Sequence, residues 1–106
     1  MLYKFKSRAA ADLVMLEPAG RRLLEVLGRE PAAQGIFECD DLPALMRQLE
    51  QAIEQEEAML EHAEEEAKSQ GQSIRRPEVS LRQRLWPMRE MMRRSHAEGH
   101  PIVWGV

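Results

Sequence analysis

Two successive stretches of the chain carry opposite charge, and this pattern restricts the fold more than any other feature of the sequence. Residues 44–70 hold eight glutamates against one arginine and one lysine, whereas residues 75–94 hold seven arginines against two glutamates. Like charges four positions apart weaken an isolated helix by roughly 0.2–0.5 kcal/mol per pair. Each stretch should therefore lie against the other, as an antiparallel helical pair joined by the loop 69–79.

Apolar spacing predicts where these two helices begin and end. Pro43 in a first turn, after Asp40 or Asp41 as the cap, begins an acidic helix that runs to about Lys68. Its apolar residues recur at helical intervals and are Leu45, Leu49, Ile53, Leu60, Ala63 and Ala67. The basic helix starts after the capping-box pattern of Ser80 and Gln83 and ends near residue 98, before Gly99 and Pro101. Leu81, Leu85, Met88 and Met92 line its apolar face.

The two helices differ in length. At a rise of about 1.5 Å per residue, the acidic helix is longer by about 13 Å. One end of it should extend past its neighbour, and this overhang should include Glu64–Glu66.

The rest of the chain adds strands and one short helix, which together indicate an α+β fold in a single domain, residues 1–106. Residues 2–6 alternate like a half-buried strand, and residues 101–104 are apolar enough to require a sheet neighbour. Residues 13–16 fit a buried strand paired with the first, although a helical turn fits the same apolar run. The expected fold is a small, mainly antiparallel sheet of about three strands packed with three helices.

The remaining helix precedes the two charged helices in the sequence. It has Pro18 in its first turn and Gly28 at its C-terminal cap. The segment 29–39 contains Pro31 and Gly35 and is predicted to be a loop. It has room for a short extended piece at Ile36–Phe37.

Composition narrows the environment in which the chain works. No apolar run approaches the ~20 residues of a membrane helix, and the N-terminus lacks a secretory signal pattern. The single cysteine, Cys39, cannot form an internal disulfide, is expected to be structural, and suits a reducing cytoplasm. A net charge of −3 gives no general attraction to nucleic acid or to an anionic membrane. We therefore expect a cytoplasmic protein without a membrane partner.

Function is predicted only in outline, and an enzyme is the less favoured reading because the chain shows no phosphate loop, nucleophile elbow or His-Glu-x-x-His motif. The charged helices favour a non-catalytic interaction or regulatory domain with a protein partner or a second copy of the chain. Whether their charges pair within one chain or between chains is open. The candidate interaction surface consists of Arg82, Arg89, Arg93, Arg94, Trp86 and Trp104.

An alternative hypothesis is a small-ligand or metal-binding protein that uses Trp86, Trp104, His96 and His100. Pro87 inside a helix frees a backbone carbonyl, and two nearby indoles would line a groove beside it. This reading requires the indoles to be close in space, and a metal would need a further ligand. No cofactor is indicated. Nucleic-acid binding through the arginines is disfavoured by the nearby glutamates.

Three segments together resemble a known family. The chain begins MLYKFKSRAAADLVMLEPAGRRLLEVLGREPAAQGIFE, continues with VSLRQRLWPMREMMRR and closes with PIVWGV. This pattern resembles a family of short proteobacterial proteins catalogued as a domain of unknown function, and the resemblance spans essentially the whole chain. It implies a bacterial, cytoplasmic, stand-alone domain, and it transfers no activity, cofactor or site residue.

Overall fold

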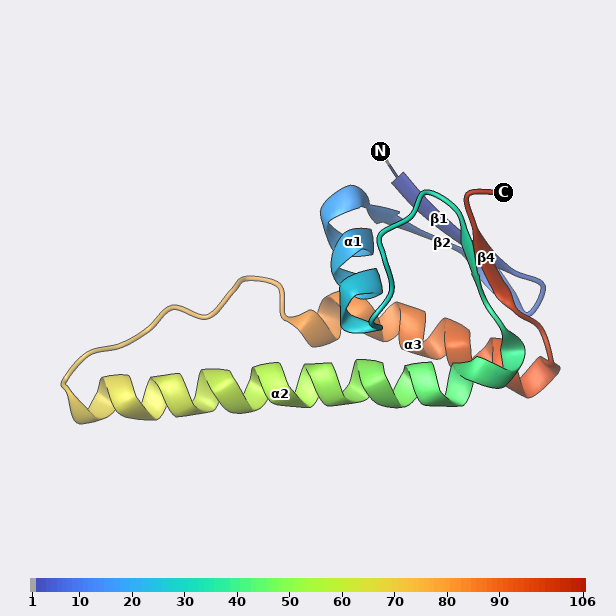
Figure 1. Ribbon diagram of the computed structural model, residues 1–106. Coiled ribbons are helices and arrows are strands. Elements are labelled where there is room, and N and C mark those ends of the chain that lie inside the picture. Colours follow the sequence, from blue (N-terminus) through green and yellow to red (C-terminus); the bar gives the residue numbers. More distant parts are fainter. Residues whose placement is uncertain (1) are drawn as a thin grey trace.

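The computed structural model describes residues 2–106 and contains four strands and three α-helices (Figure 1). The elements follow the order β1 (Leu2–Ser7), β2 (Ala10–Leu16), α1 (Glu17–Val26), β3 (Gly35–Phe37), a short 3-10 turn (Cys39–Asp41), α2 (Leu42–Ser69), α3 (Leu81–Glu98) and β4 (Ile102–Trp104). The fold is therefore α+β, as the sequence predicts.

All neighbouring strands run antiparallel, in the order β2-β1-β4-β3. The C-terminal strand β4 lies inside the sheet, with Phe5 opposite Trp104 on one side and Phe37 opposite Ile102 on the other. The sheet has one strand more than the expected three. The additional strand, β3, falls where the sequence left room for an extended piece, and it is too short to show its own alternating pattern.

Strand β2 settles the ambiguity at residues 13–16 in favour of a strand, which begins earlier than expected, at Ala10. Met15 faces the core opposite Tyr3, while Val14 and Leu16 on either side of it are exposed. Because successive strand residues point to opposite faces, apolar side chains on both faces appear in the sequence as a continuous apolar run. The run therefore reflects a sheet whose outer face is also apolar, not a strand buried on both sides.

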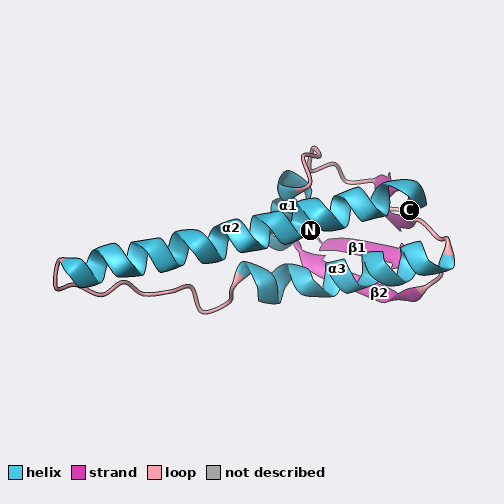
Figure 2. Ribbon diagram, turned by 90° about the horizontal axis from the view of Figure 1, so that it is seen from below, coloured by secondary structure: helices cyan, strands magenta, loops and turns pink. Residues whose placement is uncertain are grey.

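The antiparallel helical pair forms within one chain, and α2 and α3 lie side by side (Figure 2). The bounds agree with the prediction to within one residue at each end. The hydroxyl of Ser80 accepts from the backbone N–H of Gln83, whose side chain accepts from the N–H of Ser80, so the predicted capping box is present. Gly99 ends α3 in the left-handed conformation, at φ 76°.

One hydrophobic core lies between the sheet and the helices. Tyr3, Phe5, Phe37, Ile102 and Trp104 point inward from the sheet and are at most 3% exposed. The rings of Phe37 and Trp104 lie 4.7 Å apart between centroids, an ordinary tilted aromatic contact. The helices contribute the other side of this core with Leu23, Leu24, Leu42, Leu45, Leu49, Ile53, Leu85, Met88 and Met92.

Helix α2 extends well past the start of α3, and the chain returns along this overhang as an extended loop (Figure 1). The overhang contains Glu64–Glu66, as the length difference predicts, and Arg76 in the loop pairs with Glu64. The molecule consequently measures 51 × 28 × 22 Å. Within residues 2–106, none of the helices has the length and apolar character needed to cross a membrane.

Candidate functional site

Most of the arginines predicted to form an interaction surface are paired inside the chain. Nε of Arg89 lies 2.9 Å from Glu50, and Nε of Arg82 lies 2.7 Å from Glu57, so both contacts join α3 to α2. The hydrogen bond to Glu57 is the main reason why the pKa of Arg82 is raised above its ordinary value. These two ion pairs link α2 to α3 at the surface of the helical pair.

Arg93 and Arg94 lie nearer the C-terminal end of the same helix and do not extend this ladder. Nε of Arg93 lies 2.8 Å from Glu90 on its own helix. Arg94 borders a shallow hollow between α3 and β2 that also contains Glu90 and Asp12. Arg93 therefore has a carboxylate partner in its own helix, whereas Arg94 makes no ion pair among residues 2–106.

The two tryptophans occupy separate environments. Trp86 lies on the surface of the helical pair, where the guanidinium carbons of Arg82 and Arg89 are 5.2 and 5.0 Å from its ring. Trp104 is in the core, and its indole N–H donates to the carbonyl of Ala32 at 3.0 Å. The groove between two neighbouring indoles that the alternative hypothesis requires is therefore not formed.

The histidines near the end of α3 also separate. His96 is exposed on the last turn, and His100 follows Gly99 and borders a hollow next to the sheet. Within the described residues, no three histidine, cysteine, aspartate or glutamate side chains are grouped as metal ligands would be.

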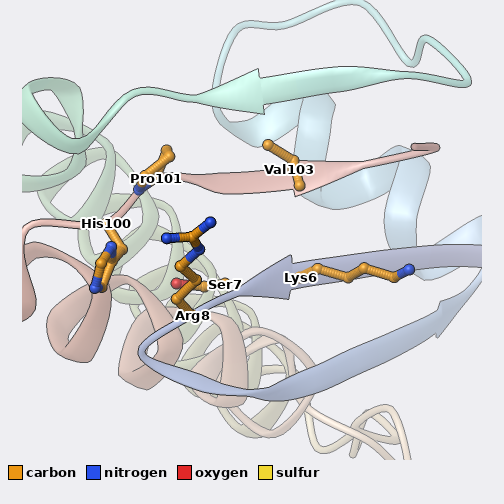
Figure 3. Close-up of a pocket in the computed structure, with 6 residues that line it drawn as sticks. All are labelled: Lys6, Ser7, Arg8, His100, Pro101 and Val103. Atoms are coloured by element: carbon orange, nitrogen blue, oxygen red, sulfur yellow. The ribbon is translucent and has the colours of Figure 1, made fainter.

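That hollow, which we call the basic hollow, measures about 510 Å³ and is lined by a lysine, an arginine and a histidine (Figure 3). It lies where the β1–β2 turn meets the segment that enters β4. Its lining consists of Lys6, Ser7, Arg8, His100, Pro101 and Val103. Figure 3 shows the guanidinium of Arg8 between His100 and Val103, with Lys6 extending along β1 away from them.

Local hydrogen bonds hold the walls of the basic hollow in place. The hydroxyl of Ser95, buried in α3, donates to the hydroxyl of Ser7 at 2.8 Å. The backbone N–H of Ala9 donates to the same Ser7 oxygen, and the N–H of His100 donates to the carbonyl of Ser95 at 2.8 Å. Both sides of the hollow are thus tied to one residue of α3.

The charge of the basic hollow is not offset by its own lining, which includes no carboxylate. Among residues 2–106, neither Lys6 nor Arg8 makes an ion pair, whereas Lys4 pairs with Asp12 at 3.6 Å. The sequence hypothesis included His100 but not Lys6 or Arg8. Alternation along β1 places Lys6 on the outer face, but Arg8 lies in the β1–β2 turn after an irregularity between Phe5 and Ser7, so no local pattern indicates the two together.

The outer face of the sheet forms a second surface, which we call the open sheet face. The helices cover the opposite side of the sheet and lie behind it in Figure 3. Leu2, Val14 and Leu16 on the open face are 58%, 51% and 69% exposed, and Ile36 is also exposed. Lys4 and Lys6 project between these apolar side chains, because the strand alternates.

The comparisons with known proteins bear on the whole chain. A comparison with curated proteins finds no match, and neither does a comparison with solved structures. A family model described as "Domain of unknown function (DUF1840)" matches residues 1–104 of the 106. This chain therefore belongs to the DUF1840 family.

Proposed function

We propose that this chain is a non-catalytic protein-interaction domain that binds its partner through the open sheet face. The observation that supports this proposal is the exposure of Leu2, Val14 and Leu16 on neighbouring strands. Grouped apolar side chains on a protein surface, rimmed by polar ones, mark interaction sites more often than single exposed ones do. In the charged helices, which the sequence favoured as the surface, Arg82, Arg89 and Arg93 pair with glutamates of the same chain.

The partner that fits this face is a protein segment with apolar and acidic side chains. The face carries Lys4, Lys6 and, at its edge, Arg8, against the single carboxylate of Asp12. Two copies of the chain stacked through this face would bring like charges together, which disfavours a homodimer there. An acidic segment would be attracted to it, and its apolar residues would cover the exposed leucines and valine.

We also propose that the domain works in the cytoplasm of a bacterium. Its one cysteine, Cys39, is free, which suits a reducing compartment. Arg82 and Arg89 of α3 pair with glutamates of α2, and this pairing argues against nucleic acid as the partner.

A random-peptide display selection on the immobilised full chain tests the interaction surface without a known partner. We expect the enriched peptides to combine aspartate or glutamate with large apolar residues, and to shift backbone resonances of β1, β2 and β4. Val14→Lys should abolish this binding. Met59→Lys is the matched control, because Met59 is 71% exposed on the α2 overhang, away from the sheet. Enriched peptides that bind both variants equally would contradict the proposal.

A further inference from the structure

We propose that the basic hollow is a binding site for a phosphate monoester whose organic part is apolar. The proposal concerns a small site at one end of the sheet, which shares Lys6 and Arg8 with the open sheet face but does not include Leu2, Val14 or Leu16. Its volume of about 510 Å³ falls within the range of small-molecule sites, roughly 300–1,000 Å³.

Three kinds of hydrogen-bond donor surround one end of the hollow. Arg8 offers a planar guanidinium fork, which matches the oxygens of a phosphate group. His100 offers an imidazole N–H from the opposite wall. The oxygen of Ser7 accepts from Ser95 and Ala9, so its own O–H is available to donate. A phosphate group has enough acceptor oxygens to meet all three donors at once, whereas a carboxylate has only two.

The net charge of the hollow favours an anion because the two flexible cations lack carboxylate partners within the described residues. Three other hollows combine arginine with acidic side chains, as Arg82 does with Glu50 and Glu54, whereas a hollow beside β2 contains Arg84 without a carboxylate. Two nearby groups disfavour an anion in the basic hollow: the C-terminal end of α3 and the exposed carboxylate of Glu98. Neither lines the hollow.

The remaining wall explains why the organic part should be apolar. Pro101 and Val103 form this wall beside Arg8, and Lys6 continues past them along β1 (Figure 3). A phosphate held by Arg8 and His100 would therefore leave its ester group against proline and valine.

NMR titration of the labelled full chain at pH 7 with inorganic phosphate and with phenyl phosphate tests the site. We expect saturable shifts at Ser7, Arg8, His100 and Val103, and tighter binding of phenyl phosphate than of inorganic phosphate. Arg8→Gln should weaken binding about tenfold, since a hydrogen bond to a charged group is lost. Arg47→Gln is the matched control, at an exposed arginine of α2.

Two results would overturn the site: shifts that sodium chloride reproduces at equal ionic strength, or equal affinity in wild type and Arg8→Gln. His100→Gln gives a second test from the opposite wall. A phosphoserine peptide distinguishes the source of the phosphate. Tighter binding of this peptide than of phenyl phosphate assigns the site to a phosphorylated protein, and weaker binding assigns it to a small molecule. Neither titration uses Val14. Failure to bind a phosphate can therefore be distinguished from failure of the peptide selection.

Discussion

The hydroxyl of Ser95 donates a hydrogen bond to the hydroxyl of Ser7 at 2.8 Å, across 88 positions of sequence. Ser95 is completely buried, and this bond ties the last turns of α3 to the β1–β2 turn. We expect Ser95→Ala to lower the free energy of unfolding by about 1 kcal/mol, the usual net value of such a bond.

Chemical denaturation of Ser95→Ala, Ser7→Ala and the double variant measures the coupling between the two hydroxyls. Ser69→Ala is the control, because its hydroxyl bonds to a carbonyl at an exposed helix end, and its effect should stay within about 0.5 kcal/mol. Additive effects of the two core-side substitutions would show that the bond contributes nothing.

The contact between Arg89 and Glu50 predicts that exchanging the two charges preserves the helical pair. Arg89→Glu and Glu50→Arg should each lower the melting temperature, because each replaces an ion pair of 2.9 Å with two like charges that face each other across the α2–α3 interface. The double exchange should recover most of the loss, with a coupling of roughly 0.5–1 kcal/mol for a partly exposed pair. Thermal melts at low and at high salt check this, and the coupling should shrink as salt rises. No recovery in the double variant would mean that the pair does not join the helices.

Replacing Gly20 with alanine should destabilise the fold, although alanine has the higher helix propensity. Alanine is favoured over glycine inside a helix by up to ~1 kcal/mol. A Cβ at Gly20 would lie 2.7 Å from Cγ of Tyr3, however, and closer still to another ring carbon. We therefore expect Gly20→Ala to destabilise the fold by roughly 1–3 kcal/mol, as overpacking does.

The matched background for this substitution is Tyr3→Leu, which removes the ring. Gly20→Ala should cost much less there than in the wild type, as urea denaturation of the four proteins would show. A stabilising effect of Gly20→Ala in the wild type would contradict the close contact between α1 and β1.

Glu90 predicts how stability changes in acid. The hydrogen bond from Arg93 holds the pKa of this carboxyl below its ordinary value of 4.5, and the charges of Arg93 and Arg89 act in the same direction. A group whose pKa is lowered by folding stabilises the folded state above the unfolded-state pKa. This contribution is therefore lost as the pH falls below about 4.5 and through the folded-state value.

Melting temperatures of wild type and Glu90→Gln between pH 7 and pH 3 measure this contribution. We expect the variant to be less stable at pH 7 and the two curves to converge at the acid end. Glu65→Gln is the control for loss of one carboxylate, since Glu65 makes no ion pair within the described chain. A constant difference between wild type and Glu90→Gln would contradict the role of the Arg93 contact.

Local patterns in the sequence were sufficient to predict the helices. Period and capping residues act within a few positions, so the capping box at Ser80 and the glycine end at Gly99 could be predicted from neighbours alone. The charge pattern also predicted the pairing of α2 with α3, because opposite charge on adjacent segments leaves few other arrangements. β3 could not be assigned as a strand, since three residues carry no period and its partner β4 lies at the far end of the chain.

The candidate site was predicted less well. Trp86 and Trp104 look equivalent in the sequence, yet one covers a surface ion-pair network and the other fills the core. Burial depends on which strands become neighbours, and the insertion of β4 between β1 and β3 decides it for Trp104. Lys6 and Arg8 could not be predicted as site residues for the same reason, because the wall opposite them comes from residues 100–103.

The sequence by itself determined the α+β class, the family and the antiparallel helical pair, since periodicity, capping and charge act over short distances along the chain. Only the tertiary structure decided which charges remain available to a partner. Contacts between α2 and α3 pair Arg82 and Arg89 with glutamates, and the sheet joins the two ends of the chain around the basic hollow. Long-range strand pairing, which no local pattern records, therefore forms both surfaces that we propose as binding sites.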